Sequence, residues 1–366
     1  MTRIFLVGGG HAHLIVMEEL AKKRRDDLEV VMATPSPWQY YSGMLPGLIS
    51  GRYAEDDCRI DIRPLAAKAG VRLILEPVAA IDADRNMVCF ADGRDLGYDL
   101  MSLDIGSEIN AGWLASLSDK LLLPKPIDGF VAQWHQLLDR AKAEAQVRLV
   151  VVGGGAAGVE LALATKRALD SASVTAEVFL IAGRSSVLSS HGARARRLAT
   201  HALARSGIMV IQERAAGSAN GVHLSNGQTL DADYVIAATG ARPASWLELS
   251  RLSLDEHGFV LVDAAHRSAS HPNVFAVGDV AARTDVTMEK SGVHAVRAGP
   301  VLARNLIAAS KGESLQPYFP RKRSLYILAS GPGTAIASWG ALSAEGRWAW
   351  RWKDRIDRNF INRLKV

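Results

Sequence analysis

Two glycine-rich turns are the clearest chemical signals in the sequence. The run Gly153-Gly154-Gly155-Ala156-Ala157-Gly158 satisfies G-x-G-x-x-G and lies between an apolar run at 148–152 and an amphipathic run at 159–169. In this context Gly153 permits a tight turn, Gly155 lets the backbone approach a pyrophosphate, and Gly158 allows close packing of helix on strand. Free N–H groups and the dipole at the helix start favour an anion. The pattern therefore predicts a dinucleotide site at 153–158.

A second turn near the N-terminus departs from the pattern at one position. Gly8 and Gly10 follow the apolar run 4–7, but His13 occupies the third glycine position. A histidine there predicts either wider packing of helix on strand or a ring that points elsewhere. A later apolar strand at 274–277 ends in Gly278-Asp279, and a carboxylate beyond a strand end accepts hydrogen bonds from polyol hydroxyls. Gly-Asp after a strand is otherwise common in simple turns.

The elements that must position these turns occur twice. Strands are predicted at 4–7 and 30–33 around one helix, and again at 148–152 and 178–181 around a second helix. A repeat of about 145 residues, from Gly8 to Gly153, indicates two mononucleotide-binding units in one α/β chain. Runs at 72–75 and 87–90, with Asp92-Gly93, predict hairpin structure inserted in the first unit, and Ser225-Asn226-Gly227 predicts a hairpin in the second.

Composition narrows the class of protein. The 366 residues suit about two domains, and the charge of +5 is spread along the chain, so nucleic-acid binding is not expected. Cys58 and Cys89 form no C-x-x-C pair, which gives no sign of a disulfide framework or a metal site. The N-terminus lacks a signal-peptide pattern, and no apolar run reaches the roughly 18 residues of a membrane span. We expect a cytoplasmic location.

Four motifs in order carry a resemblance to a known family. The two glycine turns, the run Ala238–Pro243 and the run Phe275–Asp279 together resemble the pyridine-nucleotide–disulfide oxidoreductase superfamily of FAD proteins. The resemblance implies two Rossmann-like domains of glutathione-reductase type, with FAD at the first turn and NADH or NADPH at the second. It also implies an FAD domain at 1–110 and 241–315, an inserted NAD(P) domain at 111–240, and a C-terminal region at 316–366.

The resemblance also implies roles for single residues. In the superfamily the aspartate that matches Asp279 binds the ribityl chain, and the residues that match Thr239 and Gly240 mark the crossing between the domains. Glu160 matches a glutamate near the nicotinamide, although the helix dipole alone would favour a carboxylate there. The expected FAD contacts are Gly8, Gly10, His11, Thr34, Ser42, Gly43, Gly106, Gly278 and Asp279, the expected NAD(P) contacts are Gly153, Gly155, Gly158 and Arg184, and the expected catalytic residues are Glu160, Lys290 and His294.

The residues beside the expected flavin indicate the chemistry. Disulfide reductases of the superfamily carry a cysteine pair where this chain has 40–47, and no cysteine occurs there, so a dithiol relay is excluded. The chain looks similar to type II NADH dehydrogenases and to the flavoprotein domain fused to selenophosphate synthases. We expect hydride transfer from NAD(P)H to FAD, and then to a quinone or other small acceptor. The alternatives are a sulfide:quinone reductase-like enzyme, which the positions of Cys58 and Cys89 disfavour, and a flavin-binding redox sensor or accessory protein of selenium metabolism.

The residues that usually recognise the ribose are absent. A Rossmann strand commonly ends in an acid that binds the ribose 2′-hydroxyl. The first unit instead ends in Ala33-Thr34, and the second in Ala182-Gly183-Arg184. Thr34 is expected to bond the FAD ribose. Arg184 with the following serines suits a 2′-phosphate, so NADH and NADPH both remain open.

The C-terminal segment is basic and has regularly spaced apolar residues. Residues 345–366 hold seven Lys/Arg and three Asp/Glu, and Trp348, Trp352, Ile356, Phe360 and Leu364 recur every four residues. This pattern predicts a basic amphipathic helix. Trp with basic residues suits a membrane interface, so peripheral contact with the inner face of the cytoplasmic membrane is one interpretation. The other is that the stripe packs on the body of the protein or on a second copy in a homodimer.

Overall fold

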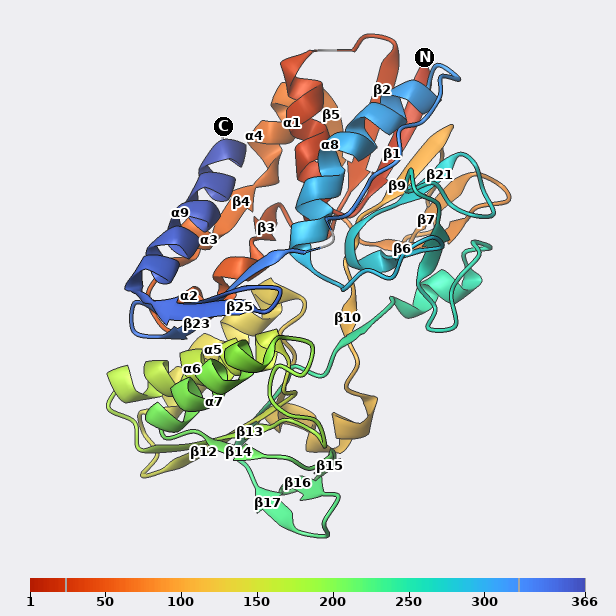
Figure 1. Cartoon of the computed structure of the whole chain (residues 1–366). Coiled ribbons are helices and arrows are strands. Elements are labelled where there is room, and N and C mark those ends of the chain that lie inside the picture. Colours follow the sequence, from red (N-terminus) through yellow and green to blue (C-terminus); the bar gives the residue numbers. More distant parts are fainter. Residues whose placement is uncertain (24, 322, 366) are drawn as a thin grey trace.

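The computed structural model describes residues 1–23, 25–321 and 323–365 and has two lobes (Figure 1). The first lobe is built on a parallel five-stranded sheet in the order β21-β9-β1-β2-β5. Its strands are β1 (Thr2–Val7), β2 (Leu28–Ala33), β5 (Val71–Ile74), β9 (Leu100–Leu103) and β21 (Val274–Ala276). Three helices of this lobe are α1 (His11–Lys22), α4 (Ile62–Ala69) and α8 (Gly292–Ala309). The last strand and α8 come from beyond the second lobe in sequence, so the chain leaves the first unit and returns to complete it.

The second lobe repeats this plan. Its parallel sheet has the order β11-β18-β12-β13-β14. The strands are β11 (Leu121–Leu122), β12 (Val147–Val152), β13 (Ala176–Ile181), β14 (Met209–Ile211) and β18 (Tyr234–Ala237). The helices are α5 (Ile127–Ala141), α6 (Ala156–Ser171) and α7 (Ala193–Arg205). The predicted α/β fold with two Rossmann-like units is confirmed.

Smaller elements decorate the two sheets. The run at 72–75, predicted as hairpin structure, instead forms β5 at the edge of the first sheet, because its apolar side chains face the core beside β2. The antiparallel insertion is β6 (Val78–Asp82), β7 (Met87–Phe90) and β8 (Asp95–Gly97). The hairpin predicted at 225–227 joins β16 (Gly221–Leu224) to β17 (Thr229–Asp231), beside β15 (Ala215–Ser218). The lobes are connected through β10 (Glu108–Ile109), which pairs with β19 (Ala241–Arg242).

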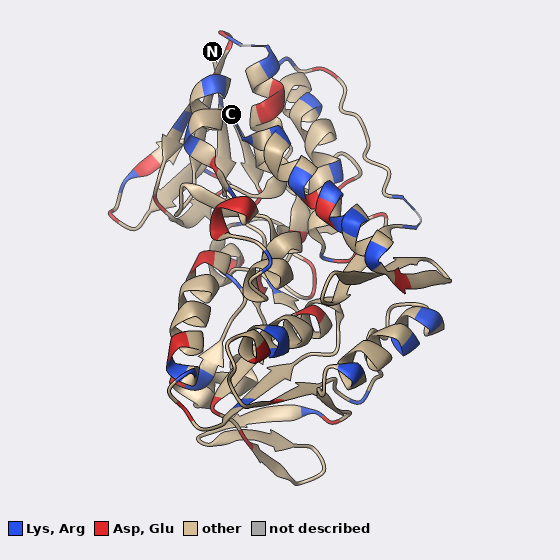
Figure 2. Cartoon of the chain, turned by 90° about the vertical axis from the view of Figure 1, so that its left-hand side faces the viewer, with Lys and Arg blue, Asp and Glu red and all other residues tan. Residues whose placement is uncertain are grey.

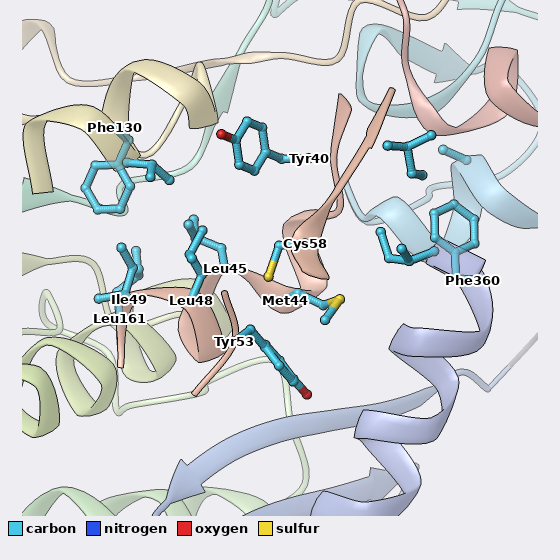
Figure 3. Packing of buried hydrophobic residues seen from close by; sticks show 14 of the residues in the cluster. Tyr40, Met44, Leu45, Leu48, Ile49, Tyr53, Cys58, Phe130, Leu161 and Phe360 are labelled. Carbon is cyan, nitrogen blue, oxygen red and sulfur yellow. The ribbon is translucent and has the colours of Figure 1, made fainter. Parts of the chain in front are cut away.

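Short elements fill the space around the first sheet. The strand pairs are β3 (Trp38–Tyr40) with β4 (Arg59–Asp61), and β20 (Val260–Val262) with β22 (Ala281–Arg283). The short helices are η1 (Ser42–Met44), α2 (Leu45–Ile49), α3 (Glu55–Cys58), η2 (Gly112–Lys120), η3 (Ser245–Leu249) and η4 (Gly278–Val280). Helix α2 is buried throughout, and Leu45, Leu48 and Ile49 pack in one cluster with Phe130 of α5 and Leu161 of α6 (Figure 3).

The C-terminal segment bridges the two lobes. Its strands are β23 (Leu325–Gly331), β24 (Thr334–Trp339) and β25 (Leu342–Gly346), which pair in this order. This sheet contacts α6 and α7, whereas α9 (Arg347–Leu364) lies beside α3 and β4 of the first lobe (Figure 1). Arg205 of α7 pairs with Glu345, and Arg363 of α9 pairs with Glu18 of α1. The tail is therefore a structural part of the body.

The apolar stripe predicted for the tail does not form one face. Phe360 and Leu364 are buried, whereas Trp348, Trp352 and Ile356 are 50%, 44% and 41% exposed. A step of four residues turns an α-helix about 40° past a full turn, so the stripe rotates from solvent into the core along α9. Packing on the body of the protein thus accounts for the buried half of the stripe, whereas the other half is exposed.

Candidate functional site

A cleft of about 500 Å³ opens at the carboxyl edge of the first sheet. Its walls are the glycine turn after β1, the segment after β2, the loop after β9, the loop before α5 and the start of α8. Open parallel sheets bind ligands at this edge, and the volume lies in the usual range for a ligand site. Seven predicted FAD contacts line the cleft: Gly8, Gly10, His11, Thr34, Ser42, Gly106 and Asp279.

The histidine in the first glycine turn is a buried structural residue. Nδ1 of His13 lies 2.7 Å from the Gly8 carbonyl oxygen, and Nε2 lies 2.8 Å from Oγ of Ser102. A carbonyl only accepts, so Nδ1 carries the proton and Nε2 accepts from the serine hydroxyl. Burial lowers the pKa of His13 to about 4. The ring thus takes the place of the direct helix–strand contact that a third glycine would allow.

Asp104, which sequence reasoning did not single out as a site residue, occupies the start of α1. The residue is 3% exposed, and its Oδ2 accepts the N–H groups of Ala12 at 2.8 Å and His13 at 3.0 Å. Its backbone oxygen accepts the N–H of Gly10 at 3.1 Å. Burial raises the pKa of Asp104 to about 7, opposed by the N–H groups of His13 and Ala12, which stabilise the carboxylate, and aided by the nearby Asp279. Only its position directly after β9, next to the first glycine turn in the folded sheet, reveals this role.

Asp279 lies across the cleft in a polar cluster. Its Oδ2 is 2.9 Å from Nζ of Lys125 and accepts the hydroxyl of Ser107 at 3.2 Å. The same ammonium donates to the Ser107 hydroxyl at 2.9 Å. Lys125 was also missed from the sequence, because it comes from the segment that enters the second lobe and matches no motif. Together these residues form an ion pair bridged by a hydroxyl on the wall of the cleft.

His11, on the cleft wall, packs against two aromatic side chains that do not themselves line the cleft. The ring of His11 contacts Tyr41 edge-on at 5.5 Å and Phe360 of α9 at 5.6 Å between centroids. Among the described residues, Nε2 of His11 is buried without a hydrogen-bond partner. Burial lowers the pKa of His11 to about 4, so the ring is neutral near pH 7. The His11 side chain therefore forms part of the packing of the cleft wall.

The second glycine turn is open toward solvent. Gly153 has φ +128° and donates to the Ile181 carbonyl at 2.8 Å, and α6 begins directly after Gly155. A Cβ at Gly158 would overlap the carbonyl oxygen of Gly153, whereas a Cβ at Gly155 would have no described atom within 4 Å. The helix start therefore packs tightly on the strand at Gly158 and is open to a ligand at Gly155, as a pyrophosphate site requires.

The loop after β13 arches beside this turn. Leu188 donates its N–H to the Gly154 carbonyl at 2.8 Å, and Gly154 lies directly against Ala182. Between these two anchors, Arg184 is exposed and Ser186 accepts from Nη1 of Arg196 at 3.3 Å. Residues 182–206 contain five arginines and no Asp or Glu. The neighbourhood of the second turn is thus positively charged.

Glu160 lies one turn into α6, where the two lobes and the tail meet. One carboxylate oxygen accepts the N–H of Ala329 in β23 at 2.7 Å, and the side chain borders a cavity of about 30 Å³ with Pro46 and Gly47. Burial raises the pKa of Glu160 to about 7, against the opposing effect of Lys353. Predicted to lie near the nicotinamide, Glu160 therefore sits between the second turn and the buried helix α2.

The tail supplies a buried charge to this region. The Lys353 ammonium lies 2.8 Å from Oδ2 of Asp357 and 2.7 Å from the carbonyl oxygen of Gly43, to which it donates. The two side chains are 9% and 5% exposed. Gly43, a predicted FAD contact, does not line the cleft itself but is held from behind by this lysine.

Several predicted residues lie elsewhere. The Lys290 ammonium donates to the Ala281 carbonyl at 2.6 Å and lies 3.7 Å above the Phe259 ring. Lys290, Gly278 and His294 line a separate cavity of about 20 Å³. Thr239 and Gly240 bond to Asn110 beside the β10–β19 pair and so hold the crossing between the lobes. These five residues do not line the cleft.

The cysteines do not reach the cleft either. Cys58 is 1% exposed at the end of α3, and burial raises its pKa to about 12. Burial also raises the pKa of Cys89 in β7 to about 11. Both thiols are therefore poor nucleophiles near neutral pH. Within residues 1–23, 25–321 and 323–365, no group of three or more His, Cys, Asp or Glu side chains is placed to hold a metal ion.

Comparisons with known proteins agree with this architecture. Residues 2–299 match the family model described as pyridine nucleotide-disulphide oxidoreductase. An NADH dehydrogenase-like protein of Mycobacterium tuberculosis is 31% identical over 298 residues, which cover 77% of this chain and 73% of the relative.

Solved structures share the fold at low sequence identity. The sulfide:quinone oxidoreductase of Aquifex aeolicus superposes with a TM-score of 0.82 at 17% identity, covering 100% of this chain and 92% of that chain. The NDH2 of Plasmodium falciparum in complex with NADH superposes with a TM-score of 0.78 at 14% identity, covering 99% and 97%. The chain belongs to the pyridine nucleotide-disulphide oxidoreductase family, whose cofactors, FAD together with NADH or NADPH, are those predicted from the motifs.

Proposed function

We propose that this chain transfers hydride from NAD(P)H to FAD and passes the electrons to a quinone or another small acceptor without a redox disulfide. One observation carries the proposal. The open glycine turn at 153–158 and the cleft of the first lobe belong to two Rossmann units that meet at Glu160 and α2. On this proposal, a nucleotide bound to each unit would direct its reactive end toward this junction.

The cleft fits FAD by its chemistry. The first glycine turn and the start of α1 line the cleft, and the Asp279–Lys125 pair lines it as well. The turn and the helix start suit a pyrophosphate, and the charged pair suits a polyol chain. When bound, FAD supplies a two-electron centre that accepts hydride and returns electrons to a second substrate.

The residues of this chain would then orient and stabilise. Gly153–Gly158 and the start of α6 hold the pyrophosphate of NAD(P)H, and Glu160 positions the nicotinamide end. The start of α8 at Gly292 lines the cleft, and a helix start stabilises a nearby anion by about 0.3 to 2 kcal/mol. That range is enough to tune a flavin potential. Lys353, rather than Lys290, brings the buried positive charge closest to the segment 42–47.

The acceptor is external on this proposal. Both thiols lie outside the cleft with raised pKa values, which argues against sulfide oxidation through a cysteine. A cysteine mechanism also makes a separate prediction, because replacing Cys58 and Cys89 together by serine would then abolish activity. The external-acceptor proposal expects this double variant to keep wild-type turnover.

Anaerobic rapid mixing of the purified, FAD-loaded protein tests the donor half. We expect NADH or NADPH to bleach the visible absorbance of the flavin within about a second, as ordinary enzyme turnover rates imply. A soluble quinone added afterwards should restore the colour. If neither nucleotide bleaches the flavin, the proposal is wrong and a binding or sensing role takes its place.

The exposed half of the tail stripe supports contact with a membrane surface. Trp348 and Trp352 lie with ring centroids 6.3 Å apart, and Arg347, Arg351 and Arg355 are exposed beside them. Basic residues gather along the exposed side of α9 (Figure 2). Trp and Arg on one face suit the headgroup region of an anionic bilayer. None of the helices described is long and apolar enough to cross a membrane, so we propose a peripheral contact.

Vesicle flotation tests this contact. The wild-type chain should float with vesicles that contain anionic phospholipid, and replacement of Trp348, Trp352 and Ile356 by serine should abolish flotation. The buried half of the stripe is untouched in this variant, so the fold is expected to persist. Arg194→Ser on α7 serves as a charge control. Equal flotation of the triple variant and the wild type would contradict the membrane role.

A further inference from the structure

Asp104 places a carboxyl group where the pyrophosphate of a bound dinucleotide is expected. Its Oδ2 takes two N–H groups of the first turn of α1. A Cβ at Gly10 would overlap the same carboxyl group, and a Cβ at Gly278 would lie 2.9 Å from Oδ1. The two glycines, which have no side chains, thus leave room for the carboxyl group of Asp104. Asp104 in turn lines the cleft.

The second unit shows what this position looks like without the carboxyl group. Asp104 donates its N–H to the last residue of β1, Val7, at 2.9 Å, and Ala238 donates to the last residue of β12, Val152, at 2.8 Å. Ala238 is therefore the counterpart of Asp104. Above the second turn, Gly155 has no described neighbour within 4 Å of its missing side chain. The space beside Gly155 in the second unit is open to an anion, whereas the corresponding space beside Gly10 in the first unit holds the carboxyl group of Asp104.

An ionised Asp104 would oppose an anion in this place. A second negative charge within a few ångströms disfavours the ionised form of a carboxyl group, as does burial. The histidines on α1, His11 and His13, are neutral near pH 7 because burial lowers their pKa values to about 4. Of the other charged groups that border the cleft, Asp279 is paired with Lys125 and Glu108 with Arg242, and Asp128 adds negative charge. No cation on α1 offsets Asp104 among these residues.

We infer that Asp104 binds FAD as the neutral acid, so that FAD binding takes up a proton and weakens as the pH rises. In this form Oδ2 still accepts from α1, and the carboxyl group adds an O–H donor in place of a charge. The inference rests on FAD occupying the cleft, and it holds whether or not the protein turns over NAD(P)H.

The direction and the size of the change in FAD affinity with pH follow from the linkage between FAD binding and proton binding. Burial already raises the pKa of Asp104 to about 7 in the ligand-free chain. Below this value the acid is protonated beforehand, and FAD affinity is independent of pH. Above it a proton must be bound together with FAD, and the dissociation constant approaches a tenfold rise per pH unit. Between pH 6.5 and 8.5 the dissociation constant should rise about 25-fold.

Calorimetric titration of the deflavinated full-length chain with FAD tests the inference. Titrations at pH 6.5, 7.5 and 8.5 give the affinity, and buffers of different ionisation enthalpy give the number of protons taken up. The wild type should take up nearly one proton at pH 8.5. Asp104→Asn keeps the shape and offers a donor without a titrating group, so its affinity should be flat across this range. Asp119→Asn, which removes an exposed carboxylate outside the cleft, should keep the wild-type profile.

Two results would overturn the inference. One is a wild-type affinity that is equal at all three pH values with no proton uptake, which needs no variant to be interpreted. The other is an Asp104→Asn protein that keeps the wild-type pH dependence, because another group would then be the one that titrates. If NAD(P)H fails to reduce the flavin while the proton uptake is present, only the dehydrogenase proposal falls.

Discussion

The two glycine turns of this protein share a motif but not an environment. In the second unit, Gly155 faces open space and Gly158 packs tightly on Gly153. In the first unit, the corresponding places hold a carboxyl group beside Gly10 and a histidine ring bonded to Gly8 and Ser102. The same backbone plan can therefore present either a bare helix start or one already filled by the protein's own side chains.

This difference teaches that a glycine in the motif need not serve the ligand. Gly155 leaves room for a pyrophosphate, whereas Gly10 leaves room for Asp104. His13 is not a failed glycine, because its two ring nitrogens are both satisfied in the core. The imperfect turn is stabilised internally, which suits a cofactor that stays bound. The perfect turn is open, which suits a substrate that enters and leaves.

The largest effect is expected from restoring the motif in the first unit. His13→Gly removes a buried ring and two hydrogen bonds, and should lower the free energy of unfolding by about 3 kcal/mol. Ser102→Ala removes one of these bonds and should cost about 1 kcal/mol. Urea unfolding followed by circular dichroism measures both. A His13→Gly protein as stable as the wild type would show that the ring is dispensable and that the two turns are equivalent.

The next effect concerns the second unit alone. Gly158→Ala forces a side chain onto the Gly153 carbonyl and displaces the start of α6, so flavin reduction at low NAD(P)H should slow roughly 100-fold. Bound FAD should remain, because the change lies in the other lobe. Gly112→Ala, where a Cβ meets no described atom within 4 Å, is the control. If the Gly158→Ala protein lost its FAD, the conclusion that the two turns bind their nucleotides independently would be wrong.

The smallest effect concerns the loop beside the second turn. Arg184→Ala removes the exposed cation nearest to the expected ribose and should raise the dissociation constant for NADPH about tenfold, with little change for NADH. The observed rates of flavin reduction against nucleotide concentration give both constants. Arg197→Ala, an exposed arginine on α7, is the matched control. Equal effects of Arg184→Ala on the two nucleotides would remove this basis for a 2′-phosphate site.

Local patterns account for most of the fold. The glycine turns with their flanking strands and helices and the basic tail helix were all predicted, because each depends on residues close together in the chain. β5 was misassigned, and β24 and β25 were missed. These strands have short apolar runs, which form strands only because a neighbouring strand or helix in the folded chain packs against them.

The sequence by itself determined that two Rossmann units with FAD and NAD(P)H motifs are present, that no cysteine pair lies at 40–47, and that the tail is basic and amphipathic. Only the tertiary structure decided which side chains share a site. Lys125 and Lys353 reach the cleft or its wall from segments that match no motif, Asp104 lies beside the predicted contact Gly106 but was not itself predicted, and Lys290 and His294 line a separate cavity. The reason is physical: burial and pairing depend on which segments the fold brings together, and spacing along the chain does not encode that.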